Sequence, residues 1–168
     1  MTHDDANDAV TIRDGTPADA ASALEVWRAA NEARSGRPPV AAQAARSSRN
    51  LQHPEAFLLV AEQRGAVVGM ALSLPARAED GAGATVPGLC HIAMVFVAPG
   101  HWGRGLGGRI VDAVLERARE RGYARAQLWT HATNARAQRL YERRGFARSG
   151  REKMDDAEER IWHYGREL

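Results

Sequence analysis

The chain has 168 residues, of which 44% are hydrophobic and 26% charged, a globular balance that suits one domain and excludes a disordered chain. The net charge is +2, and because the arginines are interleaved with acids, we expect no nucleic-acid partner. No stretch approaches the about 18 consecutive apolar residues of a membrane span, and the single cysteine, Cys90, excludes an intrachain disulfide and a four-cysteine metal site, so we expect a cytoplasmic protein without metal or membrane partner.

Apolar periodicity and turn residues divide the chain into a polar tail, 1–9, and one domain, 10–168. In the first half of the chain the sequence predicts a strand at 10–13, a helix after Thr16, a weaker helix over 40–49, a strand at 57–61 and its hairpin partner at 66–74. A mobile loop over 75–88 and a central strand at 89–98 follow. The second half is predicted to hold a helix over 107–121, a strand at 124–130, a short helix after Asn134 and a final hairpin over 147–167 with an exposed turn at 155–158. Strands and helices in this order predict an α/β or α+β fold with a mixed sheet.

The most informative segment runs from the central strand into the helix that follows it, residues 95–108. A nearly continuous apolar run ends at Pro99, and five glycines follow before Arg109, the last two at the start of the predicted helix: Gly100, Gly103, Gly105, Gly107 and Gly108. Such glycines let a backbone approach a ligand closely, and the first turn of a helix offers free N–H groups and a positive dipole end. Together with the charge of Arg104, this pattern predicts a site for a phosphate or pyrophosphate.

Two common phosphate-binding motifs fit this segment poorly. A Walker loop requires Gly-Lys-Ser/Thr at its end, and Gly107-Gly108-Arg109 stands there instead. Residues 103–108 match the dinucleotide pattern G-x-G-x-x-G, but the next strand ends at His131 without the carboxylate that would hold a ribose. A nicotinamide oxidoreductase is therefore a weaker alternative.

Two motifs together resemble the GCN5-related N-acetyltransferase (GNAT) family. The first, residues 102–107, fits Gln/Arg-x-x-Gly-x-Gly/Ala, except that Trp102 stands where Gln or Arg is usual. The second, Asn134 to Phe146, fits N-x-x-A-x-x-L-Y-x-x-x-G-F and includes Ala137, Leu140 and Tyr141. The resemblance covers nearly the whole chain, from Ile12 to Tyr164.

The resemblance implies a mostly antiparallel mixed sheet of six or seven strands, flanked by about four helices and with splayed central strands. It also implies acetyl-coenzyme A as co-substrate. Backbone amides from Gly103 to Gly108, with Trp102, Arg104 and Leu106 in the same loop, would hold the pyrophosphate. Val95, Phe96 and Val97 would pair with the pantetheine arm, Asn134 would contact that arm or the thioester end, and Ala137 would also bind the cofactor.

The chemistry requires a neutral amine, a polarised thioester carbonyl and a proton for the leaving thiolate. The resemblance assigns the proton donor to Tyr141, and the N–H of Phe96 or Val97 would polarise the carbonyl. As general base we expect His91, whose even separation from Val97 puts both on one face unless a bulge intervenes. His131 is the next candidate, whereas Cys90 is expected to face away and to belong to the core.

The acceptor is predicted to be a primary amine of a small molecule such as an amino acid, an antibiotic or a polyamine. By resemblance its site would lie beside the first helices, where Trp27, Asn31, Arg34 and Arg37, with His131, are candidates to line it. A protein N-terminus is an alternative acceptor. A second class of function stays open, a module that binds acyl-coenzyme A without turnover, and so does a homodimer.

Overall fold

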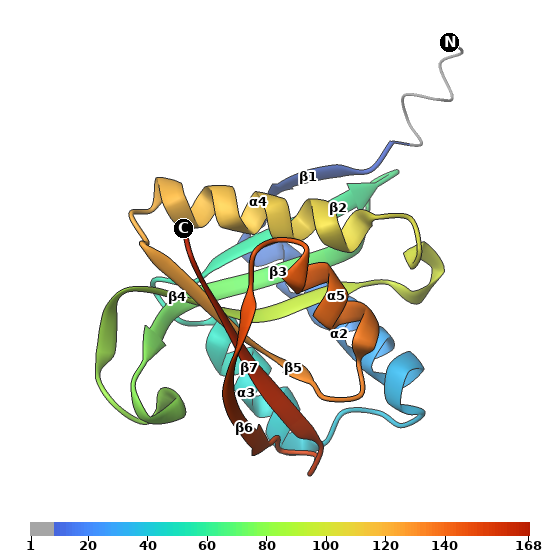
Figure 1. Cartoon of the computed structure of the whole chain (residues 1–168). Coiled ribbons are helices and arrows are strands. Elements are labelled where there is room, and N and C mark those ends of the chain that lie inside the picture. The colour runs from blue at the N-terminus through green and yellow to red at the C-terminus, as the bar shows by residue number, and fades with distance from the viewer. Residues whose placement is uncertain (1–8) are drawn as a thin grey trace.

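The structure of the protein is a computed structural model that describes residues 9–168 (Figure 1). Its elements in chain order are β1 (Thr11–Asp14), α2 (Ala20–Ser35), α3 (Ala41–Leu51), β2 (Phe57–Gln63), β3 (Ala66–Arg77), β4 (Thr85–Val97), α4 (Leu106–Glu120), β5 (Arg125–His131), α5 (Ala135–Glu142), β6 (Ala147–Met154) and β7 (Arg160–Glu167). Short 3₁₀ turns cover Pro17–Asp19, Glu79–Gly81 and Pro99–His101. Of the predicted tail, only Ala9 lies within the described residues, and the division at residue 10 stays a prediction.

All the strands belong to one seven-stranded sheet in the order β1-β2-β3-β4-β5-β7-β6. Every neighbouring pair is antiparallel except β4 and β5, which run parallel because α4 crosses over between them. The predicted fold, a mixed and mostly antiparallel sheet flanked by helices, is confirmed.

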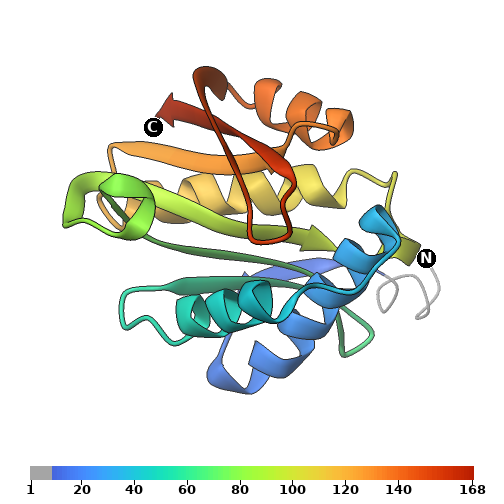
Figure 2. The same ribbon diagram turned by 90° about the horizontal axis from the view of Figure 1, so that it is seen from below.

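Helices cover both faces of the sheet and form two separate cores (Figure 2). On one face α4 and α5 bury an apolar cluster that includes Leu59, Ile92, Ile110 and Leu128. On the other face α2 packs Val26 and Trp27 against Met70, Leu72 and Met94 of β3 and β4. The sheet therefore separates the two cores, and a strand side chain belongs to one core or the other according to the face on which it points.

The bulge in β4 changes that direction in the middle of the strand. Leu72 pairs with Met94 and Ser73 with Ile92, so Ala93 is an extra residue without a partner in β3. Before the bulge, Cys90 and Ile92 point toward α4; after it, Val95 and Val97 do, and Met94 and Phe96 point toward α2. His91 and Val97 consequently face opposite sides, which is the parity change that a bulge produces.

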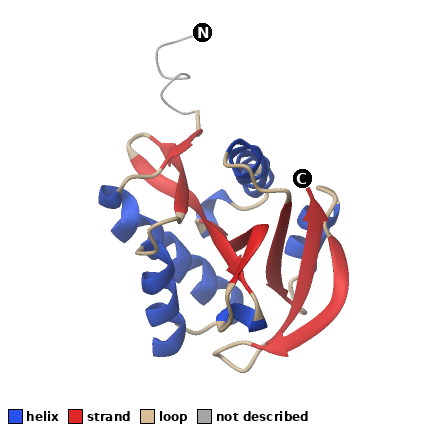
Figure 3. Ribbon diagram, turned by 90° about the vertical axis from the view of Figure 1, so that its left-hand side faces the viewer, coloured by secondary structure: helices blue, strands red, loops and turns tan. Residues whose placement is uncertain are grey.

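β4 and β5 part immediately beyond this bulge. They pair only from Leu89 with Arg125 to Ile92 with Leu128, although both strands continue. Figure 3 shows β1 to β4 and β5 to β7 as two parts of the sheet that diverge. The predicted splay of the central strands is present, and the main chain of β4 from Ala93 to Val97 has no partner strand on the β5 side.

The helices end at residues that the sequence marks. α2 stops at Gly36, which has a φ of 77°, and Asn134 caps α5 by accepting a hydrogen bond from the N–H of Ala137 at 3.1 Å. After α5, Gly145 has a φ of 82° and the N–H of Phe146 returns to the carbonyl of Tyr141 at 3.1 Å. None of the helices within residues 9–168 has the length and apolar character that crossing a bilayer requires.

The predicted loop over residues 75–88 is wrong. β3 continues to Arg77 and β4 begins at Thr85, so only the connection between them is irregular. Glycine and proline favour loops locally, but Pro75 lies opposite Cys90 next to a register shift that tolerates its missing N–H. Ala76 is buried, and this tertiary burial outweighs the local preference.

Ile110 provides a test of how α4 is held on the sheet. Gly69 of β3 has no side chain there, and a Cβ on it would lie 2.7 Å from Cδ1 of Ile110, so the helix sits directly on the strand. We expect Ile110→Ala to lower the free energy of unfolding by about 2 to 5 kcal/mol in urea titrations, because it leaves a cavity under α4. Glu116→Ala, on the exposed face of α4, is the control and should change it by less than about 0.5 kcal/mol; equal effects would contradict this packing.

Candidate functional site

The turn between β4 and α4 presents a run of unpaired main-chain donors. None of the N–H groups of residues 103–108 donates a hydrogen bond to another residue of the described chain, and the first that does is Arg109, to the carbonyl of Gly105 at 3.2 Å. Gly103 and Gly105 reach this conformation with φ values of 78° and 76°. Free donors at a helix N-terminus form an anion site, and the exposed Arg104 adds a full charge to it.

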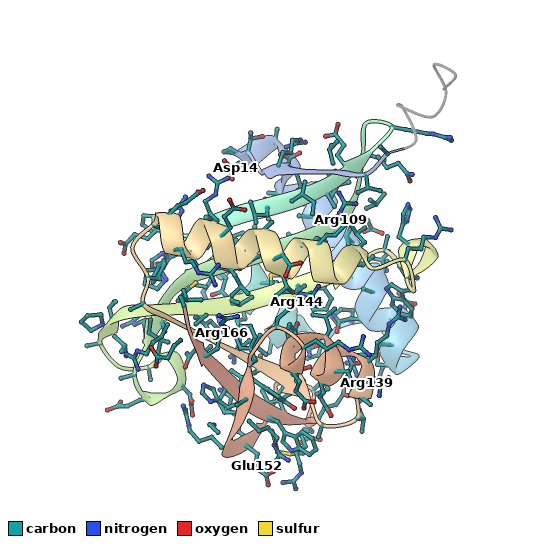
Figure 4. All side chains as sticks on the ribbon, turned by 45° about the horizontal axis from the view of Figure 1, so that its top comes forward. Asp14, Arg109, Arg139, Arg144, Glu152 and Arg166 are labelled. Carbon is teal, nitrogen blue, oxygen red and sulfur yellow. The ribbon has the colours of Figure 1, made fainter. Side chains whose placement is uncertain are left out.

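The other two glycines of the turn also serve helix packing. A Cβ on Gly107 would lie 3.1 Å from Cδ1 of Leu140, and one on Gly108 would overlap the guanidinium of Arg144. Arg144 bridges the two helices through Asp112 at 2.8 Å and the carbonyl of Gly108 at 3.2 Å (Figure 4). These contacts hold the N-terminus of α4 beside α5, which keeps the anion site next to the opening between β4 and β5.

Trp102, the position that departs from the motif, closes the end of β4. Its indole N–H donates to the carbonyl of Val97 at 2.7 Å, and 39% of the residue stays exposed. The residue therefore contributes to this site through a contact with the strand that Gln or Arg would make differently.

The unpaired edge of β4 offers main-chain groups at alternate residues. The N–H of Ala98 donates to the carbonyl of Val68 at 2.9 Å, so the hydrogen-bonding groups of Phe96, two residues back, also point toward β3. Those of Val95 and Val97 point the other way, into the opening. Of the three predicted residues, Val95 and Val97 can thus pair with an extended ligand, and Phe96 contributes its side chain on the α2 face.

Tyr141 lies in α5 at the border of the core around α4. The residue is 8% exposed and packs edge to face against Phe146, with ring centroids 5.9 Å apart. Burial raises the pKa of Tyr141 to about 12, and its hydroxyl makes no hydrogen bond with another described residue. The phenol is therefore protonated at neutral pH, and its hydrogen is not committed to another group of the described residues.

A chain of polar side chains crosses the opposite face of the sheet. His91 Nδ1 lies 3.5 Å from the amide nitrogen of Gln127, whose oxygen lies 2.9 Å from His163 Nε2, and His163 Nδ1 lies 2.7 Å from the hydroxyl of Ser149. Burial, followed by the positive charges of Lys153, His163 and Arg46, lowers the pKa of His91 to about 4. His91 is neutral at pH 7, and its conjugate acid is strongly disfavoured.

His131 lies at the end of β5 in a second polar cluster. Its Nε2 lies 2.9 Å from Asp155 Oδ2, and Arg34 of α2 binds Glu159 through two contacts of 3.0 and 3.2 Å. Ligand atoms of His131, Asp155 and Glu159 lie within 4.8 Å of one another, a spacing compatible with a cation, and the guanidinium of Arg34 already supplies one to Glu159. The predicted turn of the hairpin is in place, but Asp155 faces inward with 14% of its side chain exposed.

The remaining candidates have structural surroundings. Trp27 and Asn31 are both buried, and the amide of Asn31 donates to the carbonyl of Trp27 at 3.1 Å within α2. Cys90 belongs to the core around α4, and burial raises the pKa of its thiol to about 12, which makes it a poor nucleophile. Arg37 is exposed beyond the end of α2.

Sequence reasoning did not identify Gln127, Trp129, Lys153 and His163 as members of this region. They come from three strands, β5, β6 and β7, and meet only because Trp129 pairs with His163 and Lys153 with Ile161 across the sheet. Their rings and charges are in contact: Trp129 and His163 lie 5.1 Å apart, and Lys153 Nζ lies 4.5 Å from the centroid of Trp129. No local spacing in the sequence signals such a pairing.

The chain matches a family model described as "Acetyltransferase (GNAT) family" over residues 21–146. Among curated relatives it is 30% identical over 130 residues to a mycothiol acetyltransferase of Arthrobacter sp. strain FB24, an alignment that covers 74% of this chain and 39% of the relative. The chain spans less than half the length of the mycothiol acetyltransferases that it matches.

Solved structures share the fold. The ribosomal-protein-S18-alanine N-acetyltransferase of Escherichia coli superposes with a TM-score of 0.72 at 20% identity, covering 95% of this chain and 94% of that one. YncA of Salmonella typhimurium, a protein solved with its cofactor acetyl-CoA, gives 0.72 at 23% identity over 95% and 94% of the two chains.

The buried imidazole of His91 provides a pH test. Its pKa in the folded protein, about 4, lies below the ordinary 6.5, so between these values the unfolded state binds more protons. The neutral imidazole therefore contributes fully to the free energy of unfolding above pH 6.5. This contribution is lost as the pH falls toward 4, and the loss is on the order of 2 kcal/mol by pH 5. We expect His91→Gln to show a smaller loss of unfolding free energy than the parent protein between pH 7 and 5 in urea titrations. An identical loss in both would contradict the buried neutral state.

Proposed function

From the premise that this chain belongs to the GNAT acetyltransferase family, we propose that it transfers the acetyl group of acetyl-coenzyme A to a primary amine of a small molecule. The proposal rests on one observation: two sets of main-chain groups without hydrogen-bond partners lie next to each other. The free amides of residues 103–108 form an anion site, and the opening between β4 and β5 begins beside it. The first set suits a diphosphate and the second an extended amide-bearing arm, which are the two recognisable parts of coenzyme A.

In this proposal the cofactor enters from the side of α4 and α5. The pyrophosphate accepts hydrogen bonds from the amides of the turn and faces the charge of Arg104. The pantetheine amides pair with the outward N–H and C=O of Val95, as a strand would. The carbonyl of Val97 already accepts from the indole of Trp102, and its N–H is left for the thioester carbonyl. Asn134 lies at the end of the opening, where its carboxamide N–H groups are free to bind the arm because only its oxygen caps α5.

The acetyl group is transferred by direct attack in a ternary complex. The amine nitrogen bonds to the thioester carbonyl carbon, the carbonyl oxygen takes the electron pair and accepts a hydrogen bond from the N–H of Val97, and collapse of the intermediate breaks the C–S bond. Tyr141 gives its proton to the departing thiolate. The apolar surroundings raise the pKa of Tyr141, and they would also raise the pKa of a thiol held beside it. The pKa values of the phenol and the thiol therefore stay close enough for proton transfer.

The proton of the amine leaves on the other face of the sheet. His131 is better suited to accept it than His91, because Asp155 stands behind its imidazole at 2.9 Å and stabilises the cation that forms. His91 has no carboxylate partner within hydrogen-bonding distance in the described chain and is surrounded by cations. The positive charge of Arg46, which also acts on His91, favours an acceptor that carries a carboxylate, such as an amino acid, over a polyamine.

Arg104 tests the cofactor site. We expect Arg104→Glu to weaken coenzyme A binding by about tenfold or more, measured by isothermal titration, because a charge-assisted contact becomes a repulsion. Arg49→Glu makes the same charge change at an exposed position of α3, on the opposite face of the sheet, and should leave the affinity within about twofold because salt screens exposed charges. Equal weakening in both variants would show a response to net charge only and would contradict the site.

Tyr141 tests the chemistry. Its hydroxyl makes no hydrogen bond within the described chain, so Tyr141→Phe removes a proton donor at little structural cost. We expect kcat for thiol release, measured with acetyl-coenzyme A and a panel of amino acids, amines and aminoglycosides, to fall by about 100-fold with coenzyme A affinity unchanged. Binding of coenzyme A without thiol release for any acceptor, in the parent protein as in the variant, would instead indicate a module that holds the cofactor without turnover.

A further inference from the structure

Lys153 is the only lysine of the chain, and its amine lies at the border of the opening between β4 and β5. Leu128 is the last residue of β5 that pairs with β4, and Trp129 follows it directly. The Nζ of Lys153 lies 4.5 Å from the centroid of the Trp129 ring. An amine carried by β6 is thus held over the residue of β5 where the strands part.

The register of the hairpin puts this amine on the acceptor side. Lys153 pairs with Ile161, which pairs on its other side with His131, so the three side chains share one face. That face is opposite to the core around α4, where Tyr141 and the anion site lie. A thioester held in the opening would present its carbonyl carbon between the two sides, with Tyr141 on one and Lys153 on the other.

The surroundings of the amine act against its charged form and so increase the share of neutral, nucleophilic amine at a given pH. Burial lowers the pKa of Lys153, and Arg46 and Arg151 act in the same direction against the opposing effect of Asp80 and Asp156. Both carboxylates already have partners, since Asp80 binds Arg151 and Asp156 binds Arg46 at 2.9 Å. No carboxylate of the described chain forms an ion pair with Lys153 itself, so its ammonium is held by the face of Trp129 alone, a weaker contact.

We infer that Lys153 is itself an acetyl acceptor, and that the protein acetylates its own Nζ when acetyl-coenzyme A is present without a competing amine. The inference rests on the proposed function. The neutral nitrogen bonds to the carbonyl carbon, the C–S bond breaks, and the thiolate leaves with the proton of Tyr141. The proton lost by Nζ passes to solvent. The product is a neutral amide, so the modification removes one positive charge from the acceptor face and places an acetyl group over Trp129.

The experiment uses the whole chain and acetyl-coenzyme A alone. Intact-mass spectrometry follows the gain of one acetyl group with time, and tandem spectra of the peptide that contains Lys153 locate it. Lys153→Arg keeps the charge and removes the acceptor, Tyr141→Phe removes the proton donor, and urea-unfolded protein measures uncatalysed acetylation. The assay is repeated over a range of protein concentrations to separate transfer within one chain from transfer between chains.

We expect one acetyl group per chain at Lys153, at a rate per chain independent of protein concentration. The rate should fall by about 100-fold in Tyr141→Phe, and the site should stay unmodified in Lys153→Arg. Acetylation no faster than in unfolded protein, or unaffected in Tyr141→Phe, would overturn the inference by showing uncatalysed chemistry. If the protein binds coenzyme A and acetylates an added amine but leaves Lys153 unmodified, the inference about Lys153 is wrong and the proposed function stands. If a thermal-shift assay shows no binding of coenzyme A, both the inference and the proposed function are wrong.

Discussion

The parting of β4 and β5 is the constraint on which the rest of the structure depends. A parallel pair inside a sheet normally satisfies its main-chain groups over the whole shared length, because unpaired buried N–H and C=O groups are costly. Here pairing stops after Ile92 and Leu128, and the bulge at Ala93 turns the remaining part of β4 away. The outward N–H and C=O of Val95 and the N–H of Val97 then require water or a ligand. A protein keeps such an edge when a ligand with strand-like hydrogen bonding completes it, and the indole of Trp102 on the carbonyl of Val97 limits that edge at one end.

The bulge also assigns the chemistry to two sides of one sheet. Because the side-chain direction reverses at Ala93, the part of β4 before it sends Cys90 into the core around α4 and His91 toward the other face, and the part after it sends Val95 and Val97 toward α4. The anion site, Tyr141 and the α5 cap therefore collect on one side, and His91, His131 and Lys153 on the other. Attack on a thioester comes from one face of the planar carbonyl group, and the proton donor must reach the sulfur. A sheet that parts at one place can therefore hold the nucleophile on one side and Tyr141 on the other.

The sequence predicted best what is decided locally. Glycines at 103 and 105 mark positive φ, Asn134 marks a cap, and Gly145 with Phe146 marks a helix end, and each of these depends on a few neighbouring residues. The cofactor side is built from such signals and from one long helix with a regular apolar stripe. The acceptor side was poorly predicted because strand pairing decides it. Lys153 reaches Trp129 only through the order β5-β7-β6, and Asp155 turns inward to meet His131; neither contact has a local pattern. On the α4 face, the packing of Gly108 against the side chain of Arg144 also has no local signal.

The two sides also differ in what holds them in place. On the cofactor side α4 is fixed by fully buried side chains such as Ile110, Val111 and Val114, and displacing them exposes apolar area over the whole helix. On the acceptor side the tip of the β6–β7 hairpin is joined to α2 and α3 by Arg34 with Glu159 and Arg46 with Asp156. Partly exposed ion pairs of this kind contribute little each and respond to salt. The hairpin that carries Lys153 and Asp155 is therefore the more easily displaced part of this region, whereas α4 is held on the sheet by buried apolar contacts.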